Sequence, residues 1–288
     1  MFLKPKPAKK DFTEDMLPHT RREVFFDVLK LHWAKFLLLG LISLIFSVPL
    51  LISALMRDLY LLAVYSELGG EELVSQAVYI NNLFAALNIP CYLIYFAGFS
   101  ALARIIKRYA FEDPVSISTD FAKGFRQNVL QYLVLGFFFA VIVFACSFFQ
   151  SVSLTADGAG VSLKPGLIPT AVFALLFAPV GAYMTVTQSV YAISFRLNIL
   201  YGFVLYSKNI PQTLLTAVCC AAPFVLQLFP LINRNVLYVH IVGYILCPFI
   251  TPIIMLGFWL FTYNKLDAAI NRDYYPELVG KGTVPLNS

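Results

Sequence analysis

The sequence predicts an all-α integral membrane protein with six transmembrane helices. Of its 288 residues, 59% are hydrophobic and only 13% are charged, whereas ordinary soluble domains carry about 25% charged residues. The mean hydropathy is +0.76. Several uncharged apolar runs reach about 20 residues, and as helices they would cross roughly 30 Å of hydrocarbon. A soluble fold would need an unusually large core to bury this much apolar surface.

The apolar runs place the six spans between short polar connections. We expect them at residues 36–56, 83–103, 129–150, 167–194, 210–230 and 236–261. The chain then has an N-terminal tail with an amphipathic helix (1–35), a membrane domain (36–262) and a C-terminal tail (263–288). The connection 57–82 contains Glu67, Glu71 and Glu72. We expect a short surface segment there, such as a helix lying on the membrane.

The basic residues predict the orientation in the membrane. All but three of the 21 lysines and arginines lie on one side of the six spans, and the exceptions are Arg57, Lys164 and Arg234. Cytoplasmic segments are enriched in these residues, so both termini are expected in the cytoplasm. Trp33 and Trp259 would lie at the same interface, where amphipathic aromatic rings are favoured.

Amphipathic lead-in helices are expected on the cytoplasmic side before the first, third and fifth spans. In the first, Phe25, Leu29 and Trp33 repeat at a spacing of four, which places them on one helix face. The second is expected to begin at Pro114, because proline is favoured at the first helical position. The third covers residues 195–209.

A weak repeat links the starts of the third and fifth spans. Asn128 and Gln131 recur 81 residues later as Asn209 and Gln212, with a basic residue just upstream of each pair. This indicates three repeated helical hairpins, each with a lead-in helix and two spans; chance similarity is the open alternative. We expect these helix-start amides to cap the lead-in helices or to tie them to the bundle by hydrogen bonds.

Six basic residues are expected to form a cytoplasmic surface for a partner protein. They are Arg104, Lys107, Arg108, Lys123, Arg126 and Lys208. The alternative is that they serve only topology and attraction to anionic lipids, at about 1 kcal/mol for each charge near the surface.

The sequence contains no motif typical of an enzyme, such as a metalloprotease, nucleophile-elbow or phosphate-loop pattern. The three histidines, His19, His32 and His240, are far apart in the sequence, and we interpret them as isolated interfacial residues and not as metal ligands. We therefore expect a non-enzymatic protein without a cofactor, a metal or a nucleic-acid partner.

No charged residue lies inside the six predicted spans. Ion-coupled transporters usually keep such groups in the membrane, so the pattern argues against a proton-coupled pump and less strongly against a facilitator. The best candidate for a functional helix break is Pro248, Thr251 and Pro252 in the sixth span. Proline removes a backbone hydrogen bond, and broken helices can line a substrate site. Ordinary kinking is the alternative.

Two cytoplasmic segments carry a recognisable pattern. The first, GFSALARIIKRYAFEDPVSISTDFAKGFRQNVLQYLVLGFF (98–138), leads through a basic stretch and an acidic turn to Phe121, Phe125, Arg126, Asn128 and Gln131. The second, YAISFRLNILYGFVLYSKNIPQTLL (191–215), leads from an aromatic–arginine turn to Asn209, Pro211, Thr213 and Leu214. Over residues 36–265 the chain resembles the YesL-like family of bacterial integral membrane proteins. It departs from the family pattern at about 57–80, where family members have little between the first two helices.

The resemblance implies a multi-pass protein of the bacterial plasma membrane, associated with carbohydrate ABC uptake systems, and no defined activity. We expect an accessory or regulatory subunit that docks on a membrane complex such as a carbohydrate ABC importer. Its partners would be membrane lipids and either ABC permease subunits or a second copy of the chain. The alternative is a facilitator or channel for a small neutral solute.

Overall fold

A computed structural model describes residues 18–68, 70–156, 167–191, 193–221 and 234–283. Within these ranges every regular element is a helix, and no strand is present. The elements are α1 (Arg21–Glu67), α2 (Gly70–Ala110), α3 (Ile117–Ala156), α4 (Leu167–Val190), α5 (Phe195–Lys208), α6 (Ile210–Ala221), α7 (Arg234–Leu266), the π-helical η3 (Asp267–Asn271), α8 (Arg272–Tyr274) and the 3₁₀-helical η4 (Pro276–Leu278). The prediction of an all-α chain is confirmed for the described residues.

Four of the described helices are long and apolar enough to cross a membrane. They are Arg21–Glu67, Glu71–Ala110, Ile117–Phe149 and Leu237–Tyr274. They contain nearly all of the predicted first, second, third and sixth spans. The apolar part of α4, Leu175–Val190, is shorter, and α6 has 12 residues. The rest of the predicted fifth span, 222–230, lies outside the described residues, so six spans stay a prediction.

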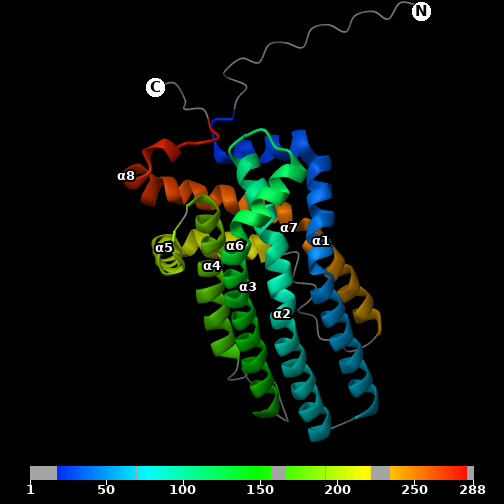
Figure 1. Ribbon diagram of the computed structural model, residues 1–288. Coiled ribbons are helices and arrows are strands. Elements are labelled where there is room, and N and C mark those ends of the chain that lie inside the picture. Colours follow the sequence, from blue (N-terminus) through cyan, green and yellow to red (C-terminus); the bar gives the residue numbers. More distant parts are fainter. Residues whose placement is uncertain (1–17, 69, 157–166, 192, 222–233, 284–288) are drawn as a thin grey trace, which may run out of the picture.

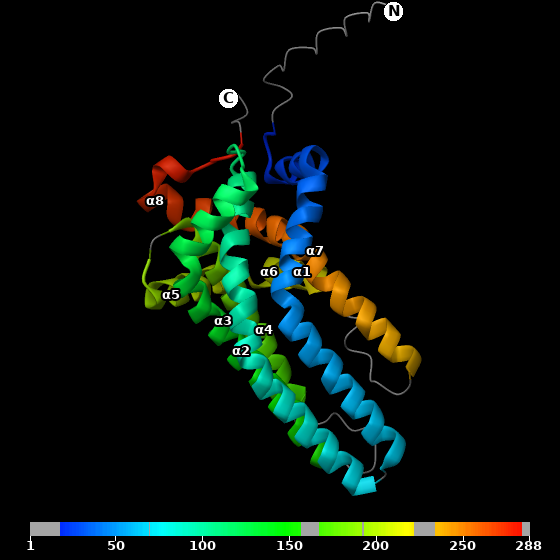
Figure 2. The same ribbon diagram turned by 45° about the vertical axis from the view of Figure 1, so that its right-hand side comes forward.

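The lead-in segments are continuous with the long helices, except before the fifth span. Thr20 caps α1 in a reciprocal capping box with Glu23, and the helix bends at His32, where φ is −127° and ψ is 20°. The first turns of α1 therefore lie across the end of the bundle before the helix turns along it (Figures 1 and 2). The second lead-in begins at Ile117 and not at Pro114. Only the third, α5, is a separate helix.

The expected surface segment at 57–82 is instead the tip of a helical hairpin, so this prediction was wrong. α1 continues to Glu67 and α2 starts at Gly70, so both helices run straight past the ends of the predicted spans (Figure 1). The reason is a small apolar core between them, formed by Leu61, Ala77, Ile80 and Phe84. Ala77, Ile80 and Phe84 are spaced by three and four residues and therefore share one face of α2, which meets Leu61 of α1.

The main core lies between the helices near the end where the described chain starts and finishes, which we call the terminal end (Figure 1). α2 packs between α1 and α3, α7 packs on α1, and α4 packs on α3 and α5 (Figures 1 and 2). Tyr132, Tyr183 and Tyr263 are among the largest fully buried side chains. Each of these tyrosine hydroxyls has a hydrogen-bond partner, as buried polar groups require.

A buried amide fastens α5 to α4. Asn198 is fully buried, and its side-chain nitrogen donates to the Met184 carbonyl at 3.1 Å and to the Gln188 side chain at 3.0 Å. Thr187 donates to the Asn198 side-chain oxygen. These contacts place the short helix α5 against the end of α4 and leave the linker before it beside the terminal end.

Candidate functional site

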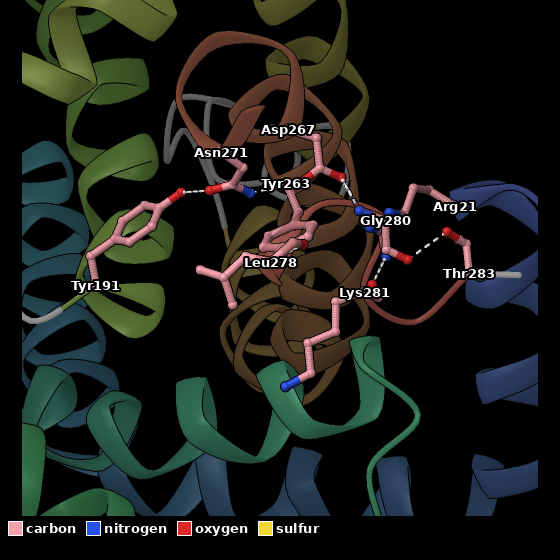
Figure 3. A network of polar contacts seen from close by, with 9 residues as sticks. All are labelled: Arg21, Tyr191, Tyr263, Asp267, Asn271, Leu278, Gly280, Lys281 and Thr283. Atoms are coloured by element: carbon pink, nitrogen blue, oxygen red, sulfur yellow. Dashed lines mark hydrogen bonds and ion pairs between the residues drawn. The ribbon is translucent and has the colours of Figure 1, made fainter. Parts of the chain in front are cut away.

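A network of polar contacts joins both ends of the described chain at the terminal end (Figure 3). Its members come from the start of α1, the linker after α4, the end of α7, η3 and the C-terminal segment. We call them the terminal network: Arg21, Tyr191, Tyr263, Asp267, Asn271, Leu278, Gly280, Lys281 and Thr283. The network connects residues that are up to 260 positions apart in the sequence.

Asp267 is the centre of the terminal network. Its carboxylate accepts from Arg21 Nη2 at 3.2 Å, from Asn271 Nδ2 at 2.7 Å and from the backbone N–H of Gly280 at 3.3 Å. The Arg21 and Asp267 side chains are only 12% and 15% exposed. A largely buried ion pair with further hydrogen bonds orders its surroundings more strongly than an exposed pair. The carboxylate therefore holds three segments in one arrangement.

Tyr191 extends the network to the linker between α4 and α5. Its hydroxyl donates to the Asn271 side-chain oxygen, and its ring lies 4.9 Å from that of Tyr275. The Tyr191 side chain is buried, and a phenol is an ordinary hydrogen-bond donor at physiological pH.

The C-terminal segment is attached through its backbone and two cations. The carbonyl of Leu278 accepts from the Tyr263 hydroxyl at 2.5 Å, and the carbonyl of Lys281 accepts from Arg21. The Lys281 ammonium lies 4.6 Å from the centre of the Phe111 ring, within the range of cation–π attraction. At Gly282 φ is +84°, and a Cβ there would collide with the Ala110 carbonyl, so this close approach requires glycine.

Three of the six predicted surface cations are engaged inside the protein. Arg108 forms an ion pair with the buried carboxylate of Asp120 at 2.5 Å, and Arg104 lies 3.7 Å from the same carboxylate. Lys107 donates to the backbone carbonyl of Ser189 at 2.8 Å, which links α2 to the end of α4. These three residues hold α2, α3 and α4 together near the terminal end, a role that the prediction of a docking surface did not include.

The other three predicted cations are exposed. Lys123 and Arg126 follow each other at a spacing of three on α3, and Lys208 ends α5. None of them forms a salt bridge with the described part of the chain. Two of the six, Lys123 and Arg126, thus project from one helix face and are available to an outside group.

The helix-start amides occupy different environments, although they match in sequence. Asn209 ends α5, and its side chain donates to the Leu205 carbonyl at 2.9 Å. Gln212 accepts from Lys265. Asn128 and Gln131 lie inside the uninterrupted helix α3, and neither side chain has a hydrogen bond to another described residue. The predicted capping or tying role is therefore seen at the second pair only.

The predicted break in the sixth span is a continuous stretch of helix. α7 runs from Arg234 to Leu266 through Pro248 and Pro252. Thr251 donates its hydroxyl to the Cys247 carbonyl at 2.8 Å and accepts from Tyr95 at 3.4 Å. A hydroxyl bond to the carbonyl four residues earlier is a common contact of threonine inside a helix.

A second polar group, which sequence reasoning missed, lies between α1 and α7. We call it the Asp58 cluster: Arg57, Asp58, His240 and Tyr244. Asp58 is 1% exposed and His240 is 3% exposed. Arg57 donates to Asp58 Oδ1 at 3.0 and 2.8 Å, while His240 Nδ1 lies 3.0 Å from Asp58 Oδ2 and Tyr244 donates to the same oxygen. The carboxylate thus has a partner on every side.

The sequence contained a signal for this cluster. Arg57 and Asp58 directly follow the first predicted span, in the connection that the sequence predicts to be a surface segment. His240 and Tyr244 are four residues apart and therefore share one face of α7. A carboxylate at the end of one apolar helix can become buried when that helix packs against another that carries a histidine and a tyrosine on the facing side.

Most of the polar groups described above hold helices together, and Lys123 and Arg126 are exposed positive charges. None of these described groups has an arrangement suited to metal binding. Among the described residues no group of three or more His, Cys, Asp or Glu side chains could hold a metal ion. In comparisons of the chain with known proteins, no protein-family model, no curated protein and no solved structure matches it.

Proposed function

We propose that this protein is a non-enzymatic accessory subunit of another membrane complex, docked through its terminal end. In this proposal the chain crosses the membrane six times, and the terminal end faces the bacterial cytoplasm. The asymmetric distribution of lysine and arginine supports the orientation. The resemblance to the YesL-like family supports a carbohydrate ABC importer as the complex.

The observation that carries the proposal is the contrast between engaged and exposed cations at the terminal end. Arg21, Arg108 and Lys107 are engaged in contacts that hold the chain segments in place. Lys123 and Arg126 remain exposed on an ordered helix. A preorganised surface loses little conformational entropy on binding, and exposed cations favour an acidic partner surface.

Co-purification tests the proposal. Tagged full-length protein would be cross-linked in its native membrane, extracted in mild detergent and analysed by mass spectrometry. We expect permease subunits with the wild type and their loss in the double variant Lys123→Glu, Arg126→Glu. Arg196→Glu is the matched control, because Arg196 is an exposed cation outside the predicted surface.

Two results would contradict docking through this surface. One is a wild-type monomer without a cross-linked membrane partner. The other is a partner retained equally by the double variant and by Arg196→Glu. Cross-links between copies of the chain alone would indicate self-association.

A facilitator for a small neutral solute is the second candidate. One observation favours it: His240, Tyr244, Cys247 and Thr251 follow one face of α7, and Thr251 meets Tyr95 of α2. Flux of sugars and amino acids into liposomes tests this function. We expect a transported solute to lose most of its flux when Pro248, Thr251 and Pro252 are replaced by alanine. Unchanged flux would remove this stripe as a pathway.

A further inference from the structure

An open groove lies beside α1 at the terminal end. It has a volume of about 790 Å³ and is lined by Lys35, Leu38, Ile42, Ile45, Phe46, Val115, Ile117, Ser118 and Phe121. One wall is α1, and the other is the α2–α3 connection with the first turns of α3. All lining side chains are apolar except Lys35 and Ser118, and none of these described residues is acidic.

The floor of the groove depends on a close helix contact. A Cβ at Gly98 of α2 would collide with the Phe46 ring, so glycine lets this ring lie directly on α2. The rings of Phe46 and Phe121 lie 6.0 Å apart and link α1 to α3. The groove is therefore a built feature between three helices, and it leaves Ile45 with 67% exposure.

The position of Lys35 indicates where the groove meets the membrane surface. α1 bends at His32, and Trp33 beyond the bend is 63% exposed. The first predicted span starts at residue 36, directly after Lys35. Exposed tryptophan and lysine at the end of an apolar helix are typical of the headgroup layer. Lys35 forms no salt bridge with the described residues, so its charge faces outward.

The groove is long enough to take part of an acyl chain. From Lys35 to Phe46, α1 rises about 16 Å at 1.5 Å per residue, and the facing wall from Val115 to Phe121 precedes the third predicted span. A lipid with an acyl chain in the apolar part of the groove would thus have its headgroup beside Lys35 and the Ser118 hydroxyl. An unpaired cation above an apolar groove is complementary to a molecule with an anionic head and a hydrocarbon tail.

We propose that this groove binds one anionic phospholipid, with its phosphate at Lys35 and an acyl chain along Leu38, Ile42 and Ile45. This site is separate from the docking surface at Lys123 and Arg126. It also does not depend on the identity of the partner complex.

Native mass spectrometry of the delipidated full-length protein tests the proposal. The probes are phosphatidylglycerol and phosphatidylcholine with the same acyl chains. We expect wild type to prefer phosphatidylglycerol and Lys35→Gln to bind it about fivefold more weakly, the loss expected for one cation near a headgroup. Lys30→Gln is the matched control: Lys30 is exposed on the same helix and does not line the groove.

A second variant tests the apolar part. Ile45→Trp adds bulk at an exposed lining position and should weaken both lipids without changing the size-exclusion profile. The proposal is overturned if Lys35→Gln and Lys30→Gln bind phosphatidylglycerol equally, or if Ile45→Trp leaves both lipids unaffected. It is also overturned if Ile45→Trp disrupts a dimer and leaves lipid binding unaltered, because a second copy would then fill the groove.

Discussion

The terminal network and the Asp58 cluster both use a carboxylate to join distant segments, but they differ in their partners and in their access to water. Asp267 is 15% exposed as a side chain, and one of its three partners is a backbone amide. Asp58 is 1% exposed, and among the described residues its side-chain partners come from α1 and α7. The first region attaches a chain segment, and the second joins two candidate membrane-spanning helices.

This difference determines how each region responds to damage. Water can replace a lost partner near Asp267, because its surroundings are partly accessible. Near Asp58 a lost partner leaves a buried donor or charge without compensation, which costs more. The Asp58 cluster is therefore expected to contribute more to the stability of the bundle, and the terminal network more to the order of its end.

The largest effect is expected for Asp58→Ala. The change removes the buried carboxylate that Arg57, His240 and Tyr244 all contact. Breaking a buried pair costs about 3–5 kcal/mol, and we expect about 3 kcal/mol because the Arg57 side chain is 32% exposed. Thermal unfolding in detergent measures the loss.

Glu67→Ala is the control for this variant, since Glu67 is an exposed carboxylate on the same helix. Its unfolding midpoint should equal that of wild type. If Asp58→Ala is as stable as Glu67→Ala, the Asp58 cluster does not hold α1 to α7.

Asp267→Ala is expected to have the next largest effect. It removes three hydrogen bonds, one of them to Arg21, and we expect a loss of about 2 kcal/mol. Hydrogen exchange should increase in residues 276–283 while the α1–α2 hairpin stays protected. Asp273→Ala, an exposed neighbour, should leave exchange unchanged. Faster exchange throughout the bundle would show that the network is not local.

Tyr244→Phe tests a single donor of the Asp58 cluster. The phenol hydroxyl donates to Asp58 and accepts from Arg57 at 3.2 Å, so its removal should cost about 1 kcal/mol. The ring remains, and packing should be unchanged. Tyr238→Phe serves as the control, because Tyr238 is 66% exposed on the same helix. Equal stability of the two variants would argue against a contribution from this hydroxyl.

The smallest effect is expected for the two helix-start asparagines, Asn209 and Asn128, which belong to neither region. Asn209→Ala removes the bond to the Leu205 carbonyl at the end of α5 and should cost about 0.5 kcal/mol. Asn128→Ala should cost less, because its side chain forms no hydrogen bond with the described residues. Unfolding midpoints of both variants check this. An equal loss in both would favour the repeat of three hairpins.

Local sequence patterns predicted the class of the fold and several helices. The apolar runs indicated α1, α2, α3 and α7, because a helix without charge over about 20 residues belongs in a membrane. The bounds were less accurate. Residues 57–67 and 70–82 contain three glutamates and were expected as a surface segment, yet Leu61 and Ile80 pack across the hairpin and extend both helices.

Tertiary structure alone decided which polar residues face inward. Lys107 and Lys123 are both lysines near the same interface, but only Lys107 reaches a carbonyl on α4. Trp259, expected at the interface, is 2% exposed against Phe111. Asp58 is buried because α7 places His240 and Tyr244 beside it. The sequence by itself determined a helical, membrane-compatible chain, because hydropathy and helical period are local properties. The pairing of α1 with α7 determined the buried charge cluster, because such contacts join residues more than 180 positions apart.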